Sequence, residues 1–415
     1  MPRLLALCLL TFSAAQLAAG DWPQFRGPLG NGHSDVKNLP TTWNETTNIA
    51  WQTAIPGKGW SSPSLASGRL YLTAAVPVAG DEPEGPQSLH ALCVDAATGK
   101  KVWDVEVFGP QAEAPKIHVK NSHASPTALV ENGRIYVHFG HGGTACLDLA
   151  GKALWKNTEH TYKPVHGNGG SPVLVDGLLI FSCDGAADPY VVALDAATGK
   201  ERWRFQRSSD APNKFSFSTP TVIEVAGKKQ LITPGSGVVN ALDPATGQEI
   251  WRCLYGAGYS VIPKPVFGHG LLYIATGYGT PIVMAIRPDG QGDVTDSHVV
   301  WSVKKGTPHT PSLLLVSDEL YMVSDKGIVT CLDAHSGTEH WTERVGGGYS
   351  ASPLFSDGKI YVQSEEGPAL VLLPGKEFVK LADAGFKERT LASYAVGEGA
   401  LFVRTEKNLY RVEGR

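Results

Sequence analysis

Short hydrophobic runs alternate with turn-forming residues along most of the chain. One example is the apolar run at residues 192–194, which is followed by Asp195-Ala196-Ala197-Thr198-Gly199 and then by a second strand that carries Trp203. An Asp side chain accepts turn N–H groups, and glycine takes backbone angles that other residues resist. The segment therefore predicts a β-hairpin, and no long helical heptad pattern competes with it.

The same hairpin recurs along the chain. Close copies start at Asp95, Asp243 and Asp333, each followed eight positions later by a tryptophan, and a copy starting at Asp148 is one residue shorter. An indole can bury roughly 150–250 Å². One hairpin cannot cover such a surface, so the units must stack side by side. We predict that the following tryptophans dock one unit on the next: Trp51, Trp103, Trp155, Trp203, Trp251, Trp301 and Trp341.

A second signature, a usually small residue before a proline and an apolar strand, marks the start of each unit. Seven starts carry it: Ser62-Pro63, Ser125-Pro126, Ser171-Pro172, Thr219-Pro220, Lys264-Pro265, Thr310-Pro311 and Ser352-Pro353. An eighth unit near Ser393 lacks the proline and the terminal tryptophan, whereas residues 49–53 resemble a final strand without its own turn. Pairing the two closes a ring and removes an exposed sheet edge.

We therefore predict an all-β fold, an eight-bladed β-propeller of four-stranded antiparallel blades over residues 49–415, with the ring closed by an N-terminal strand. Residues 21–48 are rich in Pro, Gly and Asn and are expected to be irregular. Two units depart from the pattern. The fifth has an insertion before Trp301, and the seventh is expected to place Phe378 in the tryptophan register.

The Ala-Leu-Asp-Ala-x-Thr-Gly-Lys-x-x-Trp units resemble the repeats of PQQ-like, or quinoprotein-type, β-propellers over about residues 49–413. Two branches of that family share the repeat: quinoprotein alcohol dehydrogenases and the non-enzymatic outer-membrane-protein assembly lipoprotein. The resemblance is stronger to the second branch. It implies the propeller and the docking role of the tryptophans, and it leaves the activity open.

Composition and charge narrow the class of partner. The 415-residue chain has a net charge of −4 and no basic stripe that could follow a phosphate backbone, so we expect no nucleic acid. Residues 1–20 have the pattern of a cleavable secretory signal, and Cys8 lies inside its apolar run, which does not suit lipidation. We expect a periplasmic or secreted monomer with no transmembrane segment in the mature chain.

The cysteines favour a reduced, packed role. Five remain after the signal, an odd number that excludes a complete disulfide framework. Cys93, Cys146 and Cys331 take the repeat position that Ala193 and Ala241 hold in other units. We therefore interpret them as small buried strand residues.

The strand order of a propeller sorts its loops into two faces. The Asp-Thr-Gly turns share one face with the turns between strands one and two. The connections between blades and the loops between strands two and three share the other face, which carries the unusual polar residues. The candidate ligand-binding residues at this channel mouth are His118, Asn121, His123, His141, His166, Asn168, Asp184, Lys214, Tyr259, Tyr278, His309, Asp325 and Glu365.

Three chemical interpretations compete with simple binding. His118, His123, His141 and His166 could hold a metal through neutral imidazoles, although no metal-motif spacing supports this. A PQQ-dependent dehydrogenase would need a quinone pocket, calcium and a catalytic carboxylate, for which Asp184 or Glu365 would serve. A hydrolase or lyase has no nucleophile motif behind it.

The dehydrogenase branch implies an adjacent-cysteine disulfide against the cofactor, and this chain has neither a Cys-Cys pair nor a Cys-x-x-Cys-His haem site. We therefore predict no cofactor and no catalytic residues, with PQQ and calcium as the alternative. The expected function is that of an exported binding or scaffold module whose partner is a protein or small-molecule ligand of the cell envelope.

Overall fold

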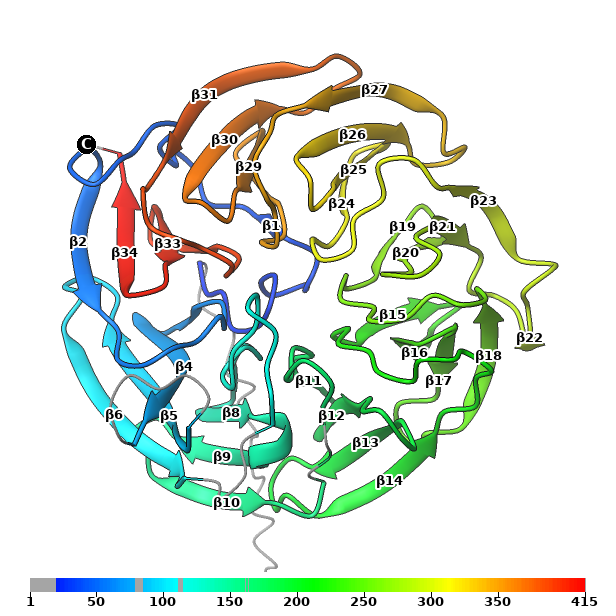
Figure 1. Cartoon of the computed structure of the whole chain (residues 1–415), viewed down its shortest axis with the longest axis horizontal. Coiled ribbons are helices and arrows are strands. Elements are labelled where there is room, and N and C mark those ends of the chain that lie inside the picture. Colours follow the sequence, from blue (N-terminus) through cyan, green and yellow to red (C-terminus); the bar gives the residue numbers. More distant parts are fainter. Residues whose placement is uncertain (1–19, 79–84, 111–114, 161, 163, 415) are drawn as a thin grey trace, which may run out of the picture.

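Eight β-sheets stand around a central axis like blades (Figure 1). The computed structural model describes residues 20–78, 85–110, 115–160, 162 and 164–414. Within these residues the chain forms strands β1 to β34 and a single 3-10 turn, η1 (Gly140–Gly142). The eight-bladed propeller predicted from the repeats is confirmed. The predicted signal at residues 1–20 lies outside the described residues, except for Gly20.

Blades one to four follow each other along the chain. Blade one contains β3 (Ser64–Ala66), β4 (Arg69–Pro77), β5 (Gln87–Asp95) and β6 (Lys101–Phe108). Blade two contains β7 (Leu129–Glu131), β8 (Arg134–His138), β9 (Thr144–Asp148) and β10 (Ala153–Asn157). Blade three contains β11 (Val173–Val175), β12 (Leu178–Cys183), β13 (Tyr190–Asp195) and β14 (Glu201–Gln206). Blade four contains β15 (Thr221–Val225), β16 (Lys228–Gly235), β17 (Val238–Leu242) and β18 (Glu249–Leu254).

Blades five to eight complete the ring. Blade five contains β19 (Val266–Gly268), β20 (Leu271–Ala275), β21 (Val283–Ile286) and β23 (Val299–Val303). Blade six contains β24 (Leu314–Val316), β25 (Glu319–Val323), β26 (Ile328–Asp333) and β27 (Glu339–Arg344). Blade seven contains β28 (Leu354–Ser356), β29 (Lys359–Gln363), β30 (Pro368–Leu373) and β31 (Val379–Gly385). Blade eight contains β32 (Ala395–Gly397), β33 (Ala400–Arg404), β34 (Asn408–Glu413) and β2 (Ile49–Ala54).

The N-terminal strand closes the ring as predicted. Strand β2 runs antiparallel to β34 and forms the outermost strand of blade eight. Trp51 lies opposite Arg411 in this ladder. One sheet thus joins the two ends of the propeller, so the blade edge that the C-terminal unit would expose is covered.

A β-bulge sets the tryptophan position. In all eight blades the ladder between the two outer strands shifts register. The residues opposite six of the seven blade tryptophans are small, which leaves room for an indole: Cys93, Cys146, Ala193, Ala241, Ala285 and Cys331. The five cysteines of the described chain are buried free thiols.

Each indole reaches the next blade. Trp155 Nε1 donates to the carbonyl of Ala196, in the hairpin turn of blade three, at 3.0 Å. Five other tryptophans make the same bond at 3.0 Å: Trp51, Trp103, Trp203, Trp301 and Trp341. The turn glycine also matters here, because the ring of Trp155 packs on Gly199 (φ 73°) so closely that a Cβ would lie 2.5 Å from it.

Trp251 is the exception, because the hairpin of blade five is remodelled. Its Nε1 donates to Gln230 Oε1 at 2.9 Å, and Gln230 Nε2 donates to the carbonyl of Pro288 at 3.0 Å. The glutamine therefore relays the bond between blades four and five. The insertion predicted before Trp301 contains β22 (Gly292–Asp293), which pairs parallel to β18 of the preceding blade.

Two expectations for irregular regions need correction. Phe378 does not stand in the tryptophan register, because Ala382 lies at that position opposite Val371. Phe378 precedes β31 and packs edge-on against Trp341 of blade six, with ring centroids 5.2 Å apart. The segment 21–48 is mostly irregular, but it contains β1 (His33–Ser34), which pairs parallel to β28.

Hydroxyl groups link the inner ends of the blades. The backbone N–H of Ser62 in blade one donates to Thr127 Oγ1 of blade two at 3.0 Å, and equivalent bonds continue around the ring. The remaining bonds, at 2.9 to 3.2 Å, have the acceptors Ser171, Thr219, Ser312, Ser352, Ser393 and Ser62. The ring is interrupted at blade five, where Lys264 takes the place of the hydroxyl residue.

The N-terminal segment fills the centre of the ring, where Figure 1 shows it in dark blue. Trp22 pairs with Leu65 of β3, and the carbonyl of Pro23 accepts from Val130 of β7 at 2.8 Å. Arg26 Nη2 donates to the carbonyl of Leu313 beside β24 at 2.7 Å. The segment thus touches the innermost strands of several blades at the centre of the ring. No helix in the described part of the chain is long and apolar enough to cross a membrane.

Candidate functional site

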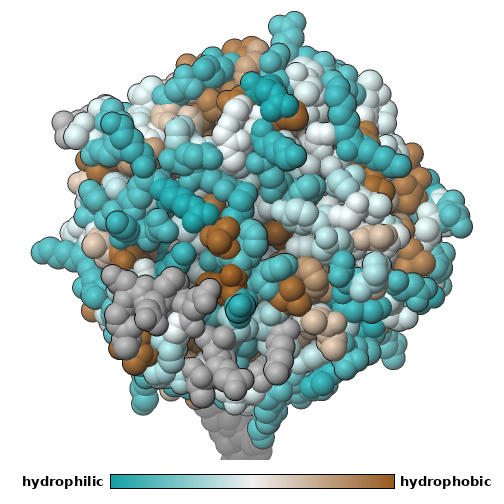
Figure 2. Space-filling model, in the orientation of Figure 1, coloured by the Kyte–Doolittle hydropathy of each residue, from teal (hydrophilic) through white to brown (hydrophobic). Residues whose placement is uncertain are grey.

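A cavity of about 350 Å³ opens at the centre of the face formed by the blade connections and the loops between strands two and three. We call this surface the cavity face. Five of the predicted ligand residues line the cavity: His118, Asn121, His166, Tyr259 and Tyr278. Figure 2 shows hydrophobic side chains near the centre of the ring, within a largely hydrophilic surface.

A continuous arc of aromatic rings follows one side of the cavity mouth. His118 and His166 pack edge-on at 5.6 Å between centroids, and His166 packs edge-on against Phe215 at 5.4 Å. Phe215 contacts Tyr259 at 5.5 Å. The arc continues through Tyr278, 6.4 Å from Tyr259, to His309, 4.2 Å from Tyr278. We call these six residues the aromatic arc. They come from the connections and loops of blades two to six.

Backbone pairing fixes the middle of the arc. Tyr259 and Tyr278 form an isolated antiparallel bridge, with N–H to carbonyl bonds of 3.0 and 2.8 Å. His166 and Ser260 have positive φ angles of 68° and 52°, conformations that non-glycine residues adopt rarely. The ring positions are therefore set by the backbone, which leaves a preorganised surface.

The other side of the mouth is polar and charged. Lys120 Nζ pairs with Glu365 Oε1 at 2.8 Å, and Ser350 Oγ donates to the same oxygen at 2.6 Å. Arg389 lies over the ring of Trp60 at 5.7 Å from its centroid. Lys120, Ser350 and Trp60 line the cavity, whereas Glu365 stands behind them and is buried. The carboxylate therefore positions the lysine.

Hydroxyl groups and one aromatic ring form the deeper wall. Phe25 of the N-terminal segment lines the cavity. So do six serine and threonine residues of the hydroxyl ring or its neighbours: Ser62, Thr127, Ser171, Ser312, Ser352 and Ser393. Each of these hydroxyl oxygens accepts an N–H bond. Ser352 donates its own proton to Ser312 Oγ at 3.0 Å, whereas the protons of the other five remain as donors. None of the described residues that line the cavity is Asp or Glu.

Burial lowers the pKa of three histidines of the cavity face, His123, His141 and His166. Burial lowers the pKa of His166, and the neighbouring His118 lowers it further. Burial lowers the pKa of His123, and burial with the adjacent His123 lowers the pKa of His141 to about 4. His123 and His141 pack edge-on at 5.1 Å, apart from the His118–His166 pair. The four predicted metal candidates thus form two pairs of imidazoles, and no described three-ligand group contains them.

Several predicted ligand residues serve the loops. Asp325 accepts bonds from the backbone N–H of His309 at 2.6 Å and from Thr310 Oγ1 at 2.6 Å, so it caps this connection. Lys214 Nζ donates to the carbonyl of Ser209. Asn168 is buried and accepts from the Tyr162 hydroxyl. These side chains shape the cavity face from behind, and none of them lines the cavity.

Asp184 is removed from the candidate ligands. Its carboxylate is completely buried and accepts from Arg207 Nε at 2.7 Å. Burial raises the pKa of the Asp184 carboxyl, and the Arg207 guanidinium opposes that rise. Arg207 also donates to Thr233 and Asn240. The pair is a buried link between blades three and four, and Asp184 does not line the cavity.

Sequence reasoning missed part of the lining. Lys120 and Trp60 belong to blade connections that the topology already placed on this face, so both could have been included among the candidate ligand residues. Phe215 lies in such a connection as well. Phe25 could not be assigned, because nothing in the repeats indicates that the N-terminal segment turns into the channel.

Known proteins share the fold and the repeats. A family profile described as outer membrane protein assembly factor BamB matches residues 35–158, 88–293 and 291–374. The assembly factor BamB of Burkholderia pseudomallei is 26% identical over 342 residues, which cover 80% of this chain and 69% of that protein. The crystal structure of BamB from Moraxella catarrhalis superposes with a TM-score of 0.62 at 14% identity, over 88% of this chain and 97% of that one.

The second branch is also represented. A quinohemoprotein alcohol dehydrogenase of Pseudomonas putida is 29% identical over 212 residues. The match covers 49% of this chain and 27% of the dehydrogenase. The chain therefore spans about a quarter of the length of this enzyme. Both branches predicted from the repeats are present among its relatives.

Proposed function

Because the chain belongs to the family described as outer membrane protein assembly factor BamB, matched in segments between residues 35 and 374, we propose that it is an exported binding or scaffold module of the cell envelope. Its working surface is the cavity face. Its ligand is a segment of another envelope protein, which inserts into the cavity between the aromatic arc and Lys120.

The observation that carries this proposal is the composition of the cavity wall. Aromatic side chains offer large contact areas at a low cost in conformational entropy, which suits the binding of a peptide segment. The hydroxyl groups below them donate to carbonyl oxygens. None of the described lining residues is acidic, so no carboxylate repels the carbonyl oxygens of a peptide that accepts hydrogen bonds from these hydroxyl groups.

The size and shape of the cavity favour insertion of a loop or a chain end. A volume of about 350 Å³ is near the lower limit of small-molecule sites, roughly 300–1,000 Å³, and holds one or two side chains. The N-terminal segment lies across the channel below the cavity, with Arg26 bonded to Leu313 and to Asn31.

The dehydrogenase alternative is not supported by the residues present. Calcium prefers oxygen ligands that include carboxylates, and the described lining offers none. Of the two carboxylates considered for catalysis, Asp184 is bound by Arg207 and Glu365 by Lys120 and Ser350. The sequence also lacks the adjacent cysteines that the dehydrogenase branch implies. These residues do not fit PQQ with calcium, and we derive no redox step.

A peptide selection tests the proposal. A random peptide library is panned on the purified chain, and the enriched peptide is titrated by calorimetry against variants. We expect Tyr259→Ala and Tyr278→Ala each to weaken binding by about tenfold or more, as for central aromatic contacts in interfaces. Leu149→Ala, an exposed apolar residue in a hairpin turn on the opposite face, is the matched control and should leave binding unchanged.

Two outcomes would contradict the proposal. Equal affinity of the peptide for the parent chain and both tyrosine variants would place binding elsewhere. Saturable dye reduction that requires added PQQ and calcium would favour the dehydrogenase alternative.

A further inference from the structure

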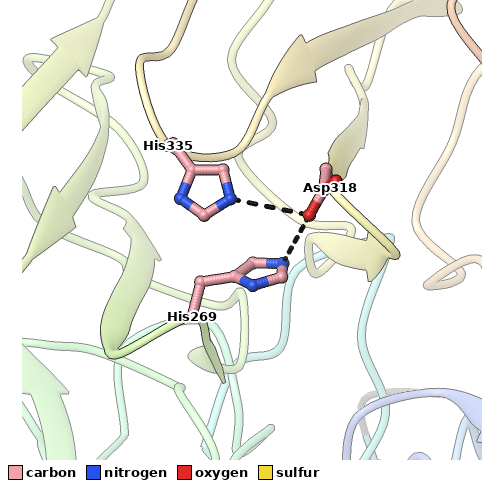
Figure 3. A group of neighbouring side chains, drawn as sticks. All are labelled: His269, Asp318 and His335. Atoms are coloured by element: carbon pink, nitrogen blue, oxygen red, sulfur yellow. Dashed lines mark ion pairs between the residues drawn. The ribbon is translucent and has the colours of Figure 1, made fainter.

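Three metal-ligating side chains meet on the face opposite the cavity, at the junction of blades five and six (Figure 3). His269 comes from the turn between β19 and β20, Asp318 from the turn between β24 and β25, and His335 from the turn between β26 and β27. Asp318 Oδ1 lies 3.6 Å from His269 Nε2 and 3.5 Å from His335 Nε2. All three ligand atoms lie within 4.8 Å of one another.

Tight turns hold the backbones of these residues. The N–H of His335 donates to Asp333 Oδ1 at 3.1 Å. The N–H of Ala334 donates to the carbonyl of Asp318 at 2.8 Å, which ties the two turns of blade six together. His269 has a φ of 55° in its two-residue turn. The imidazole rings of His269 and His335 lie 4.6 Å apart at an angle of 44°. The Nε2 edge of each ring faces Asp318 (Figure 3).

The fold does not require these residues. The other seven blades carry glycine at the position of Asp318: Gly68, Gly133, Gly177, Gly227, Gly270, Gly358 and Gly399. All seven have positive φ angles. At the position of His335, the Asp-Thr-Gly turns of blades one, three and four carry Ala97, Ala197 and Ala245. Asp318 and His335 thus both depart from the repeat, and both lie beside His269 of the neighbouring blade. Together the three residues form a set of metal ligands.

We propose that His269, Asp318 and His335 form a surface site for a borderline divalent transition metal such as Zn²⁺. Two imidazole nitrogens and one carboxylate oxygen are typical ligands of such ions, whereas Ca²⁺ and Mg²⁺ prefer oxygen ligands. Zinc bonds of about 2.0–2.2 Å in a tetrahedron place neighbouring ligand atoms roughly 3.3 Å apart. The two Nε2–Oδ1 separations of 3.6 and 3.5 Å need to shorten only slightly.

Metal binding requires one hydrogen bond within the protein to break, and it leaves one coordination position of the ion without a protein ligand. His269 Nε2 lies 2.8 Å from the carbonyl of Ser317, and this hydrogen bond must break when the nitrogen binds the ion. Three protein ligands leave a fourth position for water or for an incoming group. Because the ligands belong to two blades, the bound ion also joins blade five to blade six.

Cobalt binding to the full-length, tag-free chain after EDTA treatment tests the proposal. Co²⁺ replaces Zn²⁺ in such sites, and a visible d–d spectrum reports its nitrogen and oxygen ligands. We expect one equivalent of Co²⁺ to bind, to be displaced by Zn²⁺ and not by Ca²⁺. Asp318→Gly and His335→Ala restore the residues that other blades carry, so the fold should tolerate both. Each should weaken Co²⁺ binding by about tenfold or more.

The matched control is His298→Ala, because His298 pairs with a single carboxylate, Asp289, at 3.6 Å and has no second imidazole in a described ligand group. This variant should bind Co²⁺ like the parent chain. The proposal is overturned if the parent chain binds no stoichiometric Co²⁺, or if Asp318→Gly, still folded by its circular dichroism, binds the ion with unchanged affinity.

Discussion

A single buried lysine gives the sharpest stability prediction. Lys264 interrupts the hydroxyl ring at blade five and is 4% exposed. Its side chain lies against Gly30 of the N-terminal segment, and its charged neighbour in the described chain is the cation Arg26 rather than a carboxylate. Burial, with the neighbouring Arg26, lowers the pKa of Lys264 from 10.5 to about 7. We predict that Lys264→Met, which keeps the aliphatic stem and removes the charge, stabilises the propeller.

The magnitude follows from the pKa. A tenfold change in proton affinity corresponds to about 1.4 kcal/mol. The folded chain binds the Lys264 proton less tightly than the unfolded chain, so the unfolded state holds more protons between pH 7 and 10.5. The stability of the parent chain must therefore rise with pH across this window. The gain from Lys264→Met is at most about 5 kcal/mol below pH 7 and falls to about 2 kcal/mol at pH 9.

Guanidinium unfolding of the parent chain, Lys264→Met and a control at pH 6 and pH 9 measures these differences. The control is Lys228→Met, an exposed lysine at the start of β16 in blade four, which should change stability by less than about 0.5 kcal/mol at either pH. If Lys264→Met is less stable than the parent chain at pH 6, or if its effect is the same at both pH values, the lysine is not an unpaired buried cation.

Two further variants test contacts between blades. Asp184→Ala should destabilise the chain by about 3–5 kcal/mol in denaturant unfolding, because it leaves the buried Arg207 charge unpaired. The control Asp176→Ala removes an exposed partner of Lys229 and should cost less than about 1 kcal/mol. Equal losses would show that the Asp184 pair is not buried in solution. Gln230→Ala should cost about 1–3 kcal/mol, because it strands the buried Trp251 N–H and the Pro288 carbonyl, and exposed Gln248→Ala is its control. An unchanged melting temperature for Gln230→Ala would contradict the relay.

The repeats predicted the architecture because each unit uses the same hairpin turn and the same kind of contact between blades. The Asp–Gly turn and the tryptophan eight positions later recur with little change, and the detached strand around Trp51 could pair only with the incomplete last unit. Phe378 was placed wrongly because the hairpin of blade seven is longer, which moves the register position to Ala382. A register count cannot detect such a shift without the backbone.

The sequence predicted which face of the propeller carries the candidate residues, but it did not predict which of their side chains are buried. Topology placed Tyr259 and Tyr278 correctly on the cavity face, and both line the cavity. Asp184 lies on the same side of blade three, yet Arg207 from the following connection draws it into the interior. Nothing in the order of residues distinguishes a carboxylate that faces a channel from one that pairs with a buried arginine.

The metal candidates illustrate a different limit. Histidines were sought where they are dense in the sequence, in blades two and three, and there they form two separate pairs. The group at the junction of blades five and six joins turns that are up to 66 positions apart. Comparing the turns of successive repeats would have revealed Asp318 in place of glycine, which is the signal that was available.

Site-specific photocrosslinking in the cells that produce the chain tests the central claim, that the cavity face binds another protein. A benzoylphenylalanine replaces Tyr278, a partly exposed residue of the aromatic arc, or Lys200, an exposed residue in a hairpin turn on the opposite face. We predict a discrete protein adduct from position 278 that is absent from position 200 and is lost when Tyr259→Ala is added. The absence of any protein adduct from position 278, or the same adduct from position 200, would contradict the account.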